Sequence, residues 1–125
     1  MSHILIVDDD QKLCEVLAGE LEEYGFLTGM ANSVTGAVKY LQDNKKIDLI
    51  LLDLKLPDKD GLFLLKTLRE NNLHYKVIIL TAFADIESAM ESSKLGACDF
   101  ISKPYNFDEL LDSINKALKS KNHET

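Results

Sequence analysis

Short apolar runs alternate five times along this chain with longer stretches whose apolar residues have helical spacing, and few folds accommodate this alternation. Three strongly apolar runs extend from Ile4 to Val7, from Leu49 to Leu52 and from Val77 to Leu80. Two weaker runs extend from Phe26 to Met30 and from Cys98 to Ile101. The strong runs are too short for buried helices and rich in branched residues, as strands are in a parallel sheet covered on both faces.

The stretches between these runs place apolar residues three and four positions apart, which is the spacing of one helix face. These residues are Leu13, Val16, Leu17, Leu21 and Tyr24; Val34, Ala37, Val38 and Leu41; Leu64, Leu65 and Leu68; and Leu110, Leu111, Ile114 and Leu118. The stretch from Ile86 to Leu95 is a weaker helix, because serines and charges surround its apolar centre at Ala89 and Met90.

This order of strands and helices predicts an α/β fold. The common solution for five such units is a five-stranded parallel sheet of order 2-1-3-4-5 with helices on both faces, the doubly wound, flavodoxin-like architecture. With 125 residues, the chain has the length of one compact domain. We expect that domain over residues 3–119, and we expect residues 120–125 to be a polar tail or the start of a linker.

The charge and the cysteines narrow the classes of function. A formal net charge of −7 argues against direct binding of nucleic acid, which requires clustered Lys and Arg. Cys14 and Cys98 match no metal or redox spacing, which favours a reducing compartment. The first residues do not form a basic and apolar leader, and no run approaches the roughly 18 apolar residues of a membrane span. We therefore expect a cytoplasmic protein with no membrane segment.

Polar residues follow four of the predicted strands, at the point where each strand ends. They are Asp8, Asp9 and Asp10 after the first strand, Asp53 after the third, Thr81 after the fourth, and Ser102, Lys103 and Pro104 after the fifth. The carboxyl ends of parallel strands lie at one edge of the sheet, where open α/β sheets bind their ligands. Asp10 suits the N-cap of the first helix, and most of the other residues are candidates for a site.

Strands 1 and 3 are neighbours in the predicted order, so we expect Asp8, Asp9 and Asp53 in one pocket. Carboxylates this close repel one another unless a cation compensates them. Oxygen ligands completed by water and a phosphate suit Mg²⁺, which we expect as the cofactor. Lys103 and the hydroxyl of Thr81 would hold a phosphoryl group there. Asp53 would then be a nucleophile that forms an acyl-phosphate.

Four segments together resemble the receiver domain of bacterial two-component response regulators, in order and over nearly the whole chain. They read Ile-Leu-Ile-Val-Asp-Asp-Asp, Leu-Leu-Asp-Leu-Lys-Leu-Pro-Asp-Lys-Asp-Gly, Ile-Leu-Thr-Ala and Phe-Ile-Ser-Lys-Pro. The resemblance implies that Asp53 accepts a phosphoryl group from a histidine kinase or a histidine phosphotransfer protein. It also implies a switch protein that catalyses its own phosphorylation and slow dephosphorylation, not an enzyme in the ordinary sense.

The resemblance implies a magnesium site made of named residues. Asp9 would bind Mg²⁺ directly, Asp8 would help through water, and the backbone carbonyl of Lys55 would complete the protein's ligands beside Asp53. Lys103 would contact the phosphoryl oxygens, and its bond to Pro104 would be cis, which the chemistry of a bond before proline permits.

Five positions are implied to sense or protect the phosphate. Thr81 and Ala82 would bind the phosphoryl group, and Thr81 would form a switch pair with Phe100, whose ring rotates inward when the hydroxyl turns toward the phosphate. In the family, the side chains at Lys55 and Phe83 influence the water that hydrolyses the acyl-phosphate. Neither side chain offers a carboxylate or amide to orient that water, so we expect a long-lived phosphate.

Two types of receiver share local motifs with this chain. Lys55, Thr81, Ala82 and the aromatic Phe83 resemble single-domain regulators of sporulation phosphorelays. The runs Thr-Ala-Phe-Ala-Asp and Lys-Pro-Tyr-Asn-Phe-Asp-Glu-Leu resemble receivers of nitrogen-regulation-type activators, which drive a sigma-54 ATPase. The first type passes the phosphate onward and the second controls an output domain, so the resemblance leaves both outputs open.

Competing functions fit the same residues less well. A calcium loop containing Asp58, Asp60 and Gly61 would place Leu56 first and Thr67 twelfth, where carboxylates are required. Neither glycine-rich nucleotide-binding motif occurs, and the acidic triplet would repel the phosphate of a flavin nucleotide. A Mg²⁺-dependent phosphatase with an aspartyl nucleophile remains the alternative.

Partner surfaces follow from the same resemblance. Leu13 and Val16 align with positions that meet the histidine-bearing helix of a kinase, although both could equally be core residues. The output face is expected on the fourth helix, the fifth strand and the fifth helix, where a homodimer could also form. The weak helix from Ile86 to Leu95 would shift there when Thr81 and Phe100 move.

Overall fold

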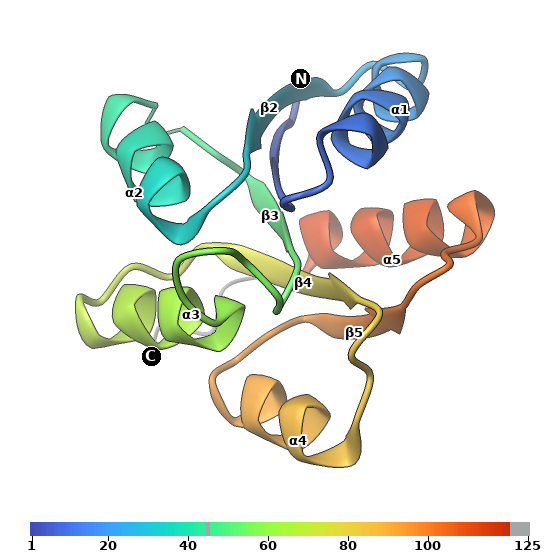
Figure 1. Cartoon of the computed structure of the whole chain (residues 1–125). Coiled ribbons are helices and arrows are strands. Elements are labelled where there is room, and N and C mark those ends of the chain that lie inside the picture. The colour runs from blue at the N-terminus through green and yellow to red at the C-terminus, as the bar shows by residue number, and fades with distance from the viewer. Residues whose placement is uncertain (45, 121–125) are drawn as a thin grey trace.

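The computed structural model describes residues 1–44 and 46–120, and within them five strands alternate with five helices (Figure 1). The elements are β1 (His3–Val7), α1 (Gln11–Glu22), β2 (Leu27–Ala31), α2 (Val34–Asp43), β3 (Leu49–Leu52), α3 (Gly61–Glu70), β4 (Lys76–Thr81), α4 (Ile86–Lys94), β5 (Asp99–Ser102) and α5 (Phe107–Lys119). One sheet of order β2-β1-β3-β4-β5 contains all five strands, and every neighbouring pair is parallel. The predicted fold class and strand order are confirmed.

Two apolar cores lie on opposite faces of this sheet. Helices α2 and α3 cover one face, and α1 and α5 cover the other (Figure 1). Side chains alternate between the two cores along each strand, so that Leu5 and Val7 of β1 belong to the first core and Ile4 and Ile6 to the second. Because both faces are covered, β1, β3 and β4 are apolar over nearly their whole length, which is why the sequence shows continuous runs instead of alternation.

Each helix begins at a residue whose side chain accepts a hydrogen bond from a backbone N–H of the first turn. These N-caps are Asp10, Ser33, Asp60, Asp85 and Asn106. Side-chain oxygens at this position satisfy N–H groups that have no partner inside the helix. The prediction that Asp10 caps the first helix is confirmed, with 3.1 Å between the Asp10 carboxylate and the backbone nitrogen of Leu13.

Helix α4 is the least buried of the five. Ser92 is its single buried residue, whereas Ile86 and Met90 are 78% and 55% exposed. At the C-terminal end of α4, the Arg69 side chain of α3 donates a hydrogen bond to the backbone carbonyl of Leu95 at 2.8 Å. The weak apolar pattern of this stretch therefore corresponds to a helix that packs loosely against the rest of the domain.

Several boundaries and one core residue differ from the predictions. Tyr24 does not lie on the apolar arc of α1, because the helix ends at Glu22 and the Tyr24 side chain is 58% exposed. Its ring instead packs at a tilt of 42° against Phe107, with 5.6 Å between the ring centroids. Strands β2 and β5 each begin and end one residue later than predicted, because pairing with the register of β1 and β4 decides their ends.

The predicted polar tail lies mostly beyond the residues that the structure describes. Residues 121–125, which make up most of the predicted polar tail, lie outside the described residues, and the predicted domain bounds of 3–119 stay a prediction. No helix in the described part of the chain combines the length and the apolar character needed to cross a membrane.

Candidate functional site

Three aspartates meet at the carboxyl edge of the sheet, as predicted. Strands β1 and β3 are paired up to Val7 and Leu52, so the next residues, Asp8 and Asp53, lie side by side where the two strands end. The backbone N–H of Asp53 donates to the carbonyl of Val7 at 2.9 Å. Carboxylate oxygens of Asp8, Asp9 and Asp53 all lie within 4.8 Å of one another. The topology therefore brings together acids that are 45 residues apart in the sequence.

Lys103 binds two of these carboxylates. Its ammonium donates to Oδ2 of Asp8 and, at 3.0 Å, to Oδ2 of Asp53. Asp8 and Asp53 are 3% and 6% exposed, whereas Asp9 is exposed at the rim. The backbone N–H of Lys103 donates to the carbonyl of Thr81 at 2.9 Å, and the bond between Lys103 and Pro104 is cis, as predicted.

The electrostatics of the site follow from burial and from these ion pairs. Burial raises the pKa of Asp8 above its usual value, and the hydrogen bond from Lys103 only partly offsets this effect. Burial alone would lower the pKa of Lys103, but its hydrogen bonds to Asp8 and Asp53 outweigh burial and raise it. Lys103 therefore stays positively charged at neutral pH, and its one ammonium pairs with two of the three clustered carboxyl groups.

The donor set fits a hard divalent cation. All the clustered side-chain ligands are carboxylate oxygens, and exposed Asp9 leaves one side open to water. Mg²⁺ prefers oxygen ligands and keeps several waters, whereas a softer metal would require nitrogen or sulfur donors. The three aspartates that the sequence predicted for magnesium are thus close enough to share one ion.

The loop after β3 closes tightly around Asp53. The Lys55 backbone N–H donates to Oδ1 of Asp53 at 3.2 Å, and Lys55 also forms an antiparallel bridge with Asp60. Gly61 donates to the carbonyl of Leu54 at 2.7 Å, and a Cβ at Gly61 would lie 2.2 Å from the backbone oxygen of Asp53. Glycine is therefore required where the helix approaches the strand end.

The residues predicted as a switch lie on the neighbouring strands β4 and β5. Thr81 is fully buried, and its hydroxyl accepts from the backbone N–H of Phe83 at 3.2 Å. Phe100 lies on β5 opposite Ile79 and packs, half-buried, against the core beneath α3. Ala82 is exposed directly after β4. The Thr81 hydroxyl is thus held by its own loop, and Phe100 lies on the adjacent strand.

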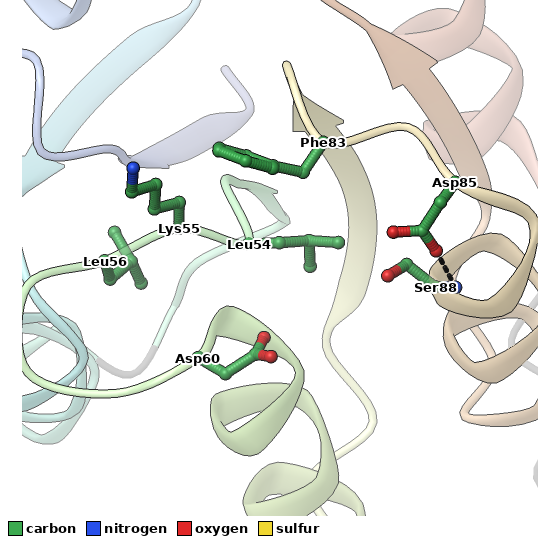
Figure 2. Close-up of a pocket in the computed structure, with 7 residues that line it drawn as sticks. All are labelled: Leu54, Lys55, Leu56, Asp60, Phe83, Asp85 and Ser88. Carbon is green, nitrogen blue, oxygen red and sulfur yellow. Dashed lines mark hydrogen bonds between the residues drawn. The ribbon is translucent and has the colours of Figure 1, made fainter.

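Lys55 and Phe83 contact each other above the loops that carry them. The Lys55 ammonium lies 5.0 Å from the centroid of the Phe83 ring, within the range of a cation–π interaction (Figure 2). Beside them is an open cavity of about 360 Å³ between the loops after β3 and β4. Its lining, drawn in Figure 2, consists of Leu54, Lys55, Leu56, Asp60, Phe83, Asp85 and Ser88.

Two residues beside the site were not found by sequence reasoning. The Asn32 side chain donates to the backbone carbonyl of Asp8 at 2.8 Å, and Asp58 accepts three hydrogen bonds from the start of α2. Asn32 follows β2 directly, so the rule that strand ends carry function could have indicated it. The residues around Asp58 suggested only a calcium loop, which their register excludes, and no local pattern signals the distant partners of Asp58.

Comparison with known proteins identifies the family to which this arrangement belongs. Residues 4–115 match the family model of the response regulator receiver domain. The transcriptional regulatory protein ZraR of Salmonella typhimurium is 36% identical over 115 residues, which are 92% of this chain and 26% of that protein. The DNA-binding transcriptional regulator NtrC of Proteus hauseri is 34% identical over 116 residues, 93% of this chain and 24% of that protein. The chain therefore spans about a quarter of the length of these relatives.

Solved structures agree in both fold and sequence. The non-phosphorylated HemR receiver domain from Leptospira biflexa has a TM-score of 0.90 and 29% identity, with the whole of both chains covered. The signal receiver domain of the putative LuxO repressor protein from Vibrio parahaemolyticus has a TM-score of 0.88 and 30% identity, covering 94% of this chain and 90% of that one. The similarity to NtrC agrees with the resemblance to nitrogen-regulation-type receivers, and these matches support a receiver over a phosphatase. The chain belongs to the receiver domain family of two-component response regulators.

Proposed function

We propose that Asp53 is the phospho-accepting residue and that its donor is the phosphohistidine of a histidine kinase or a histidine phosphotransfer protein. The observation that carries this proposal is the position of Asp53. It is a buried carboxylate that shares Lys103 with Asp8 at the carboxyl edge of the sheet. A carboxylate oxygen of Asp53 would attack phosphorus, the phosphorus–nitrogen bond would break, and the imidazole would leave and take up a proton.

Magnesium completes this site in the proposal. Asp8, Asp9, Asp53 and the backbone carbonyl of Lys55 would hold the ion, because the three carboxylates already lie within reach of one ion. When bound, Mg²⁺ neutralises the clustered carboxylates and the oxygens of the transferred group. Lys103 would contribute by moving from the carboxylate of Asp53 to the phosphoryl oxygens, which keeps its positive charge paired throughout.

A switch follows from residues on β4 and β5. The Thr81 hydroxyl would leave the N–H of Phe83 and donate to the phosphoryl group, with the N–H of Ala82 as a second donor. Phe100 would then rotate into the space behind Thr81. Helix α4 is the element that these movements would displace, because it has a single buried residue of its own. We propose the face of α4, β5 and α5 as the surface that signals to an output domain, a partner or a second copy.

Lys55 and Phe83 would decide how long the phosphate persists. The Lys55 ammonium lies over the Phe83 ring between the loops after β3 and β4 (Figure 2), and in this proposal the two side chains would shield the phosphate on Asp53. Neither side chain carries an oxygen that could orient a hydrolytic water toward the phosphorus. We propose that the acyl-phosphate is long-lived for this reason, so that slow self-dephosphorylation is the chain's own contribution to ending the signal.

The cellular role is proposed from the relatives and from the thiols. ZraR and NtrC are transcriptional regulators by name, and their similarity supports transcription regulation as the output. Nucleic acid would then be bound outside this chain, whose net charge is −7. Both cysteines, Cys14 and Cys98, are free thiols, which supports a cytoplasmic location.

Helix α1 offers a docking position for the kinase. Leu13 is half-buried, whereas Val16 is 56% exposed. The exposed Val16 supports docking of a kinase helix at this position.

Acetyl phosphate tests the central proposal. The protein is incubated with Mg²⁺ and acetyl phosphate, and its intact mass is measured with Asp53→Asn as the control. We expect a gain of one phosphoryl group in the wild type and none in the variant or in the presence of EDTA. No adduct on the wild type, or an adduct on the variant, would refute the assignment of Asp53.

A further inference from the structure

Asp58 connects two parts of the chain that are distant in sequence. It lies at the tip of the loop between β3 and α3, and its carboxylate accepts from the backbone N–H groups of Val34 and Thr35, both at 2.9 Å. The Thr35 hydroxyl donates a third bond, also at 2.9 Å. These partners form the first turn of α2, where exposed N–H groups and the helix dipole favour a negative charge.

Helix α2 has its N-cap in Ser33, so Asp58 is an additional acceptor that comes from outside the helix and its own cap. The Ser33 hydroxyl accepts from the N–H of Gly36 at 3.0 Å, which is the usual N-cap bond. Asp58 takes two further N–H groups of the same turn, from a loop more than 20 residues away. The bonds therefore satisfy two N–H groups of the first turn and at the same time join the loop to the helix.

The start of α2 is also attached to the other side of the acidic site. The Asn32 side chain donates to the carbonyl of Asp8 at 2.8 Å, and the backbone N–H of Asp8 donates to the carbonyl of Ala31 at 3.0 Å. Residues 31–35 thus contact the Asp8 loop at one end and, through Asp58, the loop after β3 at the other. We name residues 31–35 the α2 bracket.

The loop after β3 is short and closed at its base. Its base is closed by the bond from Gly61 to Leu54 and by the bridge between Lys55 and Asp60. Pro57, directly before Asp58, restricts the backbone further. Four residues separate the bridge partners, so Asp58 and the Lys55 carbonyl belong to one short closed turn.

We propose that Asp58 is a positioning residue for the magnesium site: by binding the α2 bracket, it holds the backbone carbonyl of Lys55 at a fixed distance from Asp8. This inference rests on the proposed function, in which that carbonyl is a metal ligand. Outer-shell partners of metal ligands contribute to affinity because they reduce the freedom that the ligand loses on binding. Asp58 acts in this way on a backbone ligand.

Two alanine variants separate positioning from helix capping. Asp58→Ala removes the bond between the loop and the bracket, whereas Ser33→Ala removes only the helix cap, and both weaken the first turn of α2. Isothermal titration of the unphosphorylated proteins with Mg²⁺ should give a dissociation constant about tenfold higher for Asp58→Ala than for wild type. Ser33→Ala should stay within about twofold, since the loop remains attached.

Hydrogen exchange of the metal-free proteins gives a second readout. Amides of residues 54–61 should exchange faster in Asp58→Ala, and Ser33→Ala should affect only the start of α2. The rate of phosphorylation by acetyl phosphate should require more Mg²⁺ in Asp58→Ala but reach the wild-type value at saturation. Asp58→Asn, which keeps one carbonyl acceptor, replaces Asp58→Ala under the same criteria if the alanine variant does not fold.

The outcomes decide between distinct failures. Equal Mg²⁺ affinity in wild type and Asp58→Ala, or equal losses in Asp58→Ala and Ser33→Ala, would overturn the positioning role while leaving Asp53 as acceptor. A wild-type protein that neither binds Mg²⁺ nor gains a phosphoryl group would overturn the proposed function, and the positioning role with it. Unchanged exchange over residues 54–61 in Asp58→Ala would contradict the attachment itself.

Discussion

Lys103 is the single cation that pairs with the buried carboxylates among the described residues, and its replacement measures their repulsion. Lys103→Met keeps a side chain of similar length and removes the ammonium. The wild-type ammonium binds Asp8 and Asp53, and its side chain is only 16% exposed. Without it, both carboxylates remain buried beside Asp9 with no positive charge to compensate them.

The expected loss of stability follows from these contacts. Hydrogen bonds to charged groups contribute about 1.5–3 kcal/mol each, and breaking a buried ion pair costs about 3–5 kcal/mol. The open rim at Asp9 admits water, so we take the lower end, a decrease of about 3 kcal/mol in the free energy of unfolding at neutral pH. The decrease should shrink as the pH falls through the raised pKa of Asp8, because a protonated Asp8 no longer repels Asp53.

Magnesium should reverse most of this loss. The variant site carries one more uncompensated negative charge, so it should bind Mg²⁺ more tightly than the wild type, in which Lys103 competes for the same oxygens. A ligand at 100 times its dissociation constant stabilises a protein by about 2.7 kcal/mol. Added Mg²⁺ should therefore stabilise Lys103→Met clearly more than wild type, although the variant should accept phosphate poorly.

Urea unfolding followed by circular dichroism, with EDTA or with Mg²⁺, measures these effects. For a slope of about 1.5 kcal/mol per molar urea, the midpoint in EDTA should fall by about 2 M. Lys116→Met is the matched control, because its ion pair with Asp112 is exposed and should contribute less than about 1 kcal/mol. Equal stability of wild type and Lys103→Met in EDTA, or equal stabilisation of both by Mg²⁺, would refute the reasoning.

Three further predictions concern residues around the site. Phe83→Glu or Lys55→Asn should shorten the half-life of the acyl-phosphate by about two- to fivefold, because each removes a cation–π contact that contributes about 0.5–1 kcal/mol. The half-life is measured as loss of the phosphorylated mass, and an unchanged value would contradict the shielding role of Lys55 and Phe83. Arg69→Met should lower the free energy of unfolding by about 2 kcal/mol and speed amide exchange at the C-terminal end of α4, because it removes the donor to the carbonyls of Leu95 and Gly96. Exchange that stays at the wild-type rate would show that Arg69 does not hold α4. In the native protein at neutral pH, only Cys98 should react with a maleimide, because Cys98 is exposed whereas burial raises the pKa of Cys14 to about 12. Both thiols should react in urea, and modification of Cys14 in the native state would show that helix α1 opens.

The sequence by itself determined the fold class and the members of the acidic site. Apolar runs and helical spacing are local patterns that can be recognised in a sequence. A parallel sheet places the carboxyl ends of its strands at one edge, so the proximity of Asp8, Asp53 and Lys103 could be predicted from the sequence. Residue type then indicated the chemistry, because clustered carboxylates require a cation. The cis bond before Pro104 followed from resemblance to the family.

The tertiary structure alone decided which loops contact one another. The bonds of Asp58 to α2 and the contact of Lys55 with Phe83 join segments more than 20 residues apart, and no local pattern encodes such a distance. Tyr24 fitted the helical spacing and still lies at the surface, because α1 ends before it. Spacing along a chain determines which face a residue occupies, but the packing of loops against neighbouring elements determines its partners, and those partners set the geometry around Asp53.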